Sequence, residues 1–85
     1  MSKKDKLLAR IRNNPKAVRF ADIEAILLSL GFQKRKSKHV VFTRGRFRLP
    51  IAEPHPQPHV NPVYVKHFLA LMDEIEDDDE IVVGG

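Results

Sequence analysis

The chain of 85 residues is long enough for one hydrophobic core and too short for two, so any function belongs to one compact domain and its ends. It contains no cysteine, which excludes a disulfide framework and a thiolate metal site. No segment has the roughly 20 apolar residues that a membrane span requires, and the charged N-terminus lacks the pattern of a secretory signal. We therefore expect a cytoplasmic protein with no membrane partner.

The two signs of charge are separated along the chain. Residues 1–72 contain all 15 Lys and Arg residues and only four acidic residues, a balance of +11. Residues 73–85 contain the other seven acidic residues and no basic residue, a balance of −7. Clustered positive charge gains affinity for nucleic acids because it releases counterions from their phosphates. The same charges also fit a solvated surface with no such partner.

Two helices are expected in the first third of the chain. Apolar residues on one narrow face predict a helix over residues 3–13, and Ser2 with Asp5 resembles a capping box at its start. From Phe20 the apolar residues again recur at helical spacing, which predicts a second helix. Gly31 suits the left-handed position that commonly ends a helix.

Residues 32–52 have the two-residue period of β-strands. They predict three short antiparallel strands, with a tight turn at Gly45. Val40 and Phe42 share one face of the second strand, and the third strand alternates in the same way. If this apolar face packs on the helices, the open face of the sheet presents His39, Thr43, Arg46 and Arg48, joined by Arg35.

Three alternating prolines in residues 53–60 predict an extended linker. Asn61 is expected to cap a final helix, with Pro62 in its first turn. Tyr64 and Phe68 lie on the wide apolar face of this helix, so we expect them in the core and not in a base-stacking platform.

The predicted order of elements is helix, helix, three strands and helix. This order is typical of an α+β domain in which a three-stranded antiparallel sheet packs on helices. We expect one domain in residues 1–76, with an extra N-terminal helix at 3–13 and a core at 20–75. The acidic run has nothing to bury, so residues 77–85 are expected to form a disordered tail.

Several short motifs follow one another between residues 20 and 75. They are Leu30-Gly31-Phe32 at a helix end, the basic Gln33-Lys34-Arg35-Lys36, then Ser37-Lys38-His39-Val40-Val41-Phe42, the strand Arg46 to Ile51, Pro54-His55 and the helix from Asn61. This series resembles the HicA family of toxin–antitoxin RNases. The family signature is a helix ending in Gly-Phe or Gly-Trp, a basic strand, Gly-Ser-His before an aromatic residue, and a Pro-His turn before the last helix. Here Ser37-Lys38 stands where the family has Gly-Ser, and extra prolines enlarge the turn.

The resemblance implies a double-stranded-RNA-binding-domain-like α-β-β-β-α fold with an additional N-terminal helix. It also implies an endoribonuclease toxin that cleaves mRNA and is neutralised by a cognate HicB-like antitoxin. We expect no cofactor and no metal. Only His39 inherits a catalytic role, as the base that takes the proton of a ribose 2′-hydroxyl, because imidazole titrates near neutral pH, at about 6.5. The residues expected to bind RNA are Lys34, Arg35, Lys36, Lys38, Arg46 and Arg48.

Other functions fit the same residues. The chain could be a noncatalytic module that grips duplex RNA by its shape, or a protein-interaction domain whose basic face meets an acidic partner. His39 could be a surface residue with no task. A metal site at His55 and His59 is disfavoured by the proline-rich segment and the lack of further ligands, and His67 is expected at the edge of an apolar face. We also expect the acidic tail to compete with RNA for the basic face.

Overall fold

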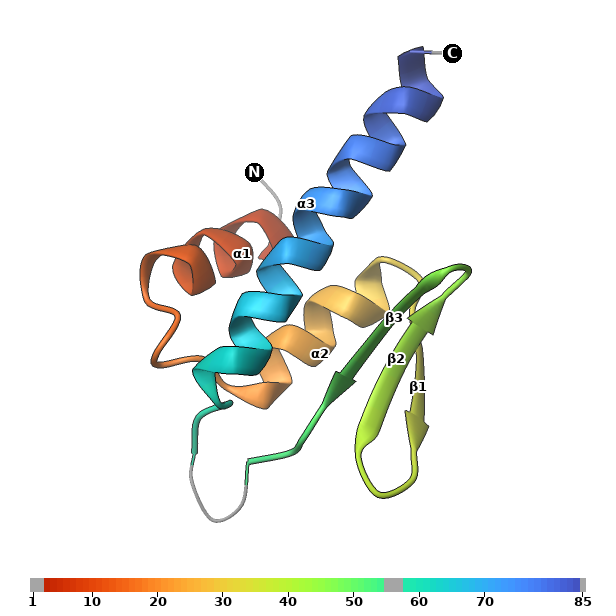
Figure 1. The fold of residues 1–85 in the computed structure, drawn as a ribbon. Coiled ribbons are helices and arrows are strands. Elements are labelled where there is room, and N and C mark those ends of the chain that lie inside the picture. Colours follow the sequence, from red (N-terminus) through yellow and green to blue (C-terminus); the bar gives the residue numbers. More distant parts are fainter. Residues whose placement is uncertain (1–2, 55–57, 85) are drawn as a thin grey trace.

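The computed structural model describes the backbone of residues 3–54 and 58–84, and the side chains of residues 4–54 and 58–76. All three helices lie on one side of the sheet, and the other side of the sheet is open (Figure 1). The chain is therefore an α+β domain with a three-stranded antiparallel sheet, as the sequence predicts. The elements are α1 (Lys3–Asn13), α2 (Phe20–Ser29), β1 (Gln33–Lys36), β2 (Val40–Arg44), β3 (Phe47–Ile51) and α3 (Pro62–Gly84).

The sheet has the order β1-β2-β3, and both of its pairings are antiparallel. Lys36 of β1 pairs with Val40 of β2, and Thr43 of β2 pairs with Arg48 of β3. Val40 and Phe42 are buried, with 1% and 0% of their surface exposed. This confirms the predicted inward face of β2. It also fixes the outward face, because successive side chains of a strand point to opposite sides.

The end of α2 has the hydrogen bonds of a Schellman motif. The Phe32 amide donates to the Leu27 carbonyl at 3.0 Å, and the Gly31 amide donates to the Leu28 carbonyl at 3.1 Å. Gly31 has a φ of +89°, in the left-handed region that favours glycine. The predicted cap is therefore confirmed, and it turns Phe32 into the core just before β1 begins.

The core is built from apolar side chains of every helix, of β2 and β3, and of the connecting segments. Within the described residues no polar or charged side chain is buried. The Val60 amide donates to the Val18 carbonyl at 2.8 Å, which ties the segment before α3 to the segment before α2. The buried residues are Ile11, Val18, Ile23, Ile26, Leu27, Phe32, Val40, Phe42, Leu49, Ile51, Val60, Val65, Phe68, Leu71, Met72 and Ile75.

Asn61 caps α3 as expected, because its Oδ1 accepts a hydrogen bond from the Val63 amide at 3.0 Å. The far end of the helix differs from the expectation. Ile75 is the last core residue, and the sequence predicts a disordered tail from residue 77, yet the α3 backbone stays helical to Gly84. A helix closes its hydrogen bonds within its own segment, so it needs no buried face to continue. This part of α3 projects beyond the rest of the molecule (Figure 1).

Ser2, the expected capping residue of α1, lies outside the described residues. Within the described part of the chain, no helix is both long enough and apolar enough to cross a membrane.

Candidate functional site

His39 lies in the turn that joins β1 to β2. The turn comprises residues 37–39, and the Ser37 amide donates to the His39 carbonyl at 3.1 Å. The sequence predicts His39 inside the second strand, on the open face with Thr43. The strand instead begins at Val40, because the pair Lys36 and Val40 closes the hairpin and leaves three residues for the turn. The His39 side chain is therefore exposed at one end of the sheet and is not in the middle of its open face.

His39 lines a pocket of about 400 Å³ at this end of the sheet. Its charged members come from three segments: Lys36 from β1, Lys38 from the turn, and Glu53 from the chain after β3. Lys36 Nζ lies 3.8 Å from Glu53 Oε1. The remaining lining residues are Ser37, Val40 and Ala52. The pocket thus combines an imidazole, a carboxylate and two ammonium groups.

Sequence reasoning did not identify Glu53 as a site residue, because 13 residues separate it from His39. The strand register brings the two together. Val40 pairs with Ile51, so the residues just before β2 and just after β3 meet at the same end of the sheet. A correct hairpin register would have been enough to predict this proximity.

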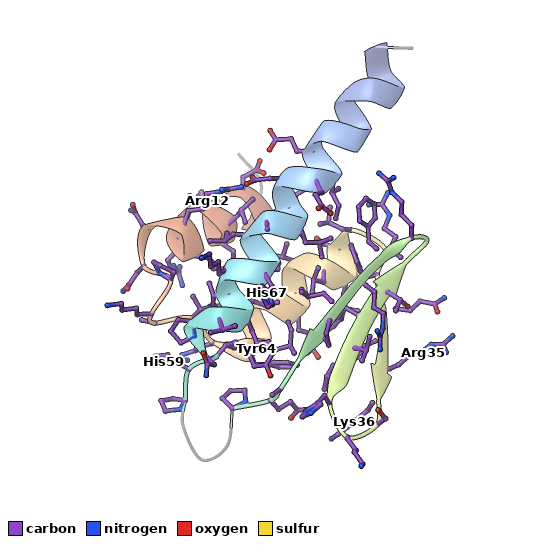
Figure 2. All side chains as sticks on the ribbon, viewed as in Figure 1. Arg12, Arg35, Lys36, His59, Tyr64 and His67 are labelled. Atoms are coloured by element: carbon purple, nitrogen blue, oxygen red, sulfur yellow. The ribbon has the colours of Figure 1, made fainter. Side chains whose placement is uncertain are left out.

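The middle of the open face forms a second basic depression, of about 580 Å³. Arg35 of β1 and Arg48 of β3 are exposed on either side of β2, and Arg35 projects away from the helical layer in Figure 2. Thr43 and Val41 lie between them, and Lys36 and Ser37 complete the lining. Of the residues predicted on this face, the structure brings Arg35, Thr43 and Arg48 together.

Lys34 belongs to the opposite side of β1. It pairs with Phe42, whose side chain faces the helices. Its Nζ forms an ion pair with Glu24 of α2 and lies 5.7 Å from the centroid of the Phe20 ring. The hydrogen bond to Glu24 raises the pKa of Lys34 above its ordinary value of 10.5. The structure therefore places Lys34 away from the open face, against α2.

Arg46 lies in the turn between β2 and β3, at the end of the sheet opposite His39. Its guanidinium carbon is 5.0 Å from the centroid of the Phe47 ring. The five residues of β2 separate the two turns, which puts at least about 13 Å of strand between them. Arg46 therefore does not share the predicted open-face site with His39. Arg48 of β3 is also distant from the His39 pocket, because it lies four residues, or about 13 Å of extended chain, before Ala52 in the pocket wall.

His59 and His67 are the other histidines that the structure describes, and neither lines the pocket around His39. Figure 2 shows His59, His67 and Tyr64 in the helical layer, away from β1. Tyr64 packs against the core, as expected, and His67 is exposed on α3. His55 lies outside the described residues. Among the described side chains, those of residues 4–54 and 58–76, no three His, Cys, Asp or Glu residues are grouped so that they could hold a metal ion.

Comparison with protein-family models, with curated proteins and with solved structures finds no match for this chain.

Proposed function

We propose that the chain is a metal-independent endoribonuclease toxin of the HicA kind, which cleaves mRNA with His39 and is neutralised by a HicB-like antitoxin. The observation that supports this best is the exposed His39 in a pocket with Lys36, Lys38 and Glu53. An imidazole next to cations suits RNA cleavage, because a phosphodiester brings negative charge and the reaction requires proton transfer. The proposal includes a cytoplasmic location and a double-stranded-RNA-binding-domain-like form of the α+β fold.

The order α2, β1, β2, β3, α3 also supports this proposal, since it matches the α-β-β-β-α order of the family. In the proposed reaction the ribose 2′-oxygen attacks the adjacent phosphorus and the 5′-oxygen leaves. His39 transfers a proton, and Lys36 and Lys38 stabilise the charge on the phosphate oxygens. Arg35 and Arg48 bind the flanking RNA backbone from the open face.

Substitution of His39 tests this proposal. His39→Ala is expected to lower the rate of RNA cleavage by about 10²-fold or more, the usual contribution of a general acid or base. RNA affinity and melting temperature should stay close to the wild-type values, because His39 is exposed and surface substitutions usually change stability by about 0.5 kcal/mol or less. The measurement is cleavage of a labelled mixed-sequence RNA, with RNA affinity and thermal unfolding of each variant.

His67→Ala is the matched control, because it removes an exposed histidine from α3 and leaves the pocket intact. Cleavage should persist in excess EDTA and should stop when the 2′-hydroxyl at the scissile position is replaced by hydrogen. Equal cleavage by wild type and His39→Ala would refute the catalytic role. Binding of RNA without cleavage by the wild type would instead favour a noncatalytic RNA-binding module.

A further inference from the structure

The pocket around His39 contains a second group that can exchange protons, and the proposed reaction needs two. A proton must leave the 2′-oxygen, and another must reach the 5′-oxygen. Within the described residues, Glu53 is the only acidic side chain that lines this pocket. Its side chain is 44% exposed, so it remains accessible to a ligand.

We propose that Glu53 and His39 form an acid–base pair, in which the Glu53 carboxylate is the base and the His39 imidazolium is the acid. This inference depends on the proposed ribonuclease activity and changes the role that the sequence alone assigns to His39. A carboxylate only accepts hydrogen bonds and protons, whereas an imidazolium has two N–H donors. The chemistry of the two residue types therefore fits the two roles.

The reaction balances with these two side chains alone. The bond from O2′ to phosphorus forms as the bond from phosphorus to O5′ breaks. The 2′-hydroxyl proton moves to the Glu53 carboxylate, and the His39 imidazolium proton moves to the departing O5′. The products are a 2′,3′-cyclic phosphate and a 5′-hydroxyl, and exchange with water restores both side chains.

The surrounding charges are consistent with these roles. Lys36 of β1 faces Glu53 at 3.8 Å, and Lys38 lies next to His39 in the turn. Lys36 is 73% exposed, so the ion pair is loose and open to solvent. A phosphate that enters the pocket can replace the carboxylate as the partner of Lys36. Glu53 is then free to accept a hydrogen bond from the 2′-hydroxyl.

The first test is the pH dependence of kcat/KM for cleavage of a labelled RNA. The wild type should give a bell-shaped profile, because the rate needs an ionised carboxylate and a protonated imidazole. If His39 were a lone base, the rate would instead rise through neutral pH and stay high. Glu53→Gln should lower the rate by about 10²-fold or more and remove the rising limb of the profile.

The second test separates acid from base. An RNA with a sulfur in place of the scissile 5′-oxygen has a leaving group that needs no proton. This substrate should restore cleavage by His39→Ala to near the wild-type rate and should leave Glu53→Gln slow. Restoration of Glu53→Gln and not of His39→Ala would overturn the assignment of roles.

Two further variants complete the design. Glu24→Gln is the matched control, because Glu24 also forms an ion pair with a lysine of β1 but lies outside the pocket. The Glu24→Gln variant should keep wild-type cleavage.

Lys36→Met removes the ion-pair partner of Glu53. This variant should cleave more slowly than the wild type yet keep both limbs of the pH profile. If Glu53 acted only by holding Lys36, Glu53→Gln would also keep both limbs.

The outcomes distinguish this inference from the proposed function. Cleavage that depends on His39 and is unchanged in Glu53→Gln would overturn the inference and leave the ribonuclease proposal in place. An absence of cleavage by the wild type would overturn both. Melting temperatures of all variants show whether a loss of activity comes from unfolding.

Discussion

Gly31 determines both where α2 ends and where Phe32 points. Its left-handed backbone lets the Phe32 amide reach the Leu27 carbonyl, and Phe32 is then 3% exposed. The Gly-Phe pair contributes to the resemblance to the HicA family. In this structure its role is to cap a helix and fill the core, so the pair supports the fold and does not by itself support RNA cleavage.

Gly31→Ala should lower the free energy of unfolding by about 1–2 kcal/mol, the cost of left-handed backbone for a residue with a side chain. Apart from Gly31 itself and its two chain neighbours, no residue has a heavy atom within 4 Å of the position of an added Cβ, so this cost comes from the backbone and not from a clash. Gly31→Asn should lose less, because asparagine tolerates this conformation. Urea unfolding of the three proteins is the measurement. An alanine variant as stable as the wild type would contradict this explanation of the cap.

At the level of elements, β1 shows how one strand divides its charges between two sides of the sheet. Lys34 and Arg35 are neighbours, yet Lys34 pairs with Glu24 of α2 and Arg35 lines the open face. Composition alone describes both as members of one basic stretch. The alternation of a strand separates them, so only Arg35 lies on the open face, where we propose that RNA binds.

Arg35→Ala and Arg48→Ala should each weaken RNA binding and reduce the salt dependence of the affinity. Each lost phosphate contact should reduce the magnitude of the slope of log K against log salt by about 0.7–0.9. Lys34→Ala removes the same charge from the other side of β1, so it should lower affinity less and mainly reduce stability. Titrations of labelled RNA at several KCl concentrations measure all three. Equal losses of affinity from Lys34→Ala and Arg35→Ala would contradict this division of the strand.

The sequence predicts the elements well, because their signals are local. The alternation of Val40 with Phe42 and the suitability of Gly31 for a cap need only neighbouring residues. The site is predicted less well. The alternation does not show where a strand ends, so His39 and Arg46 are assigned to a sheet face although they lie in turns at its two ends. The proximity of Glu53 to His39 depends on the register of β2 and β3, which the length of the turn sets and the alternation of side chains alone does not.

For the molecule as a whole, α3 lies in the helical layer, on the side of the sheet away from the open face (Figure 1). Arg12 of α1 forms an ion pair with Asp73 of α3 at 2.9 Å. Lys4 of α1 and Glu76 of α3 line one pocket, to which α2 also contributes. The acidic part of α3 therefore begins beside α1, in the helical layer, and the open face of the sheet is on the other side (Figure 1). A helical α3 cannot fold back over the open face as a disordered tail could.

Deletion of residues 77–85 tests how the acidic segment acts on RNA binding. The deletion removes four acidic residues and keeps Ile75, the last core residue of α3, so the net charge rises from +4 to +8 and the core stays complete. RNA binding should become tighter near 0.01 M salt, where charges act over about 30 Å, and this gain should largely vanish near 0.15 M, where the range is about 8 Å. A full-length variant with Asn or Gln at residues 77–80 is the matched control, and it should behave like the deletion if charge is the cause. Unchanged or weaker binding of both variants at low salt would show that the acidic segment does not oppose RNA binding.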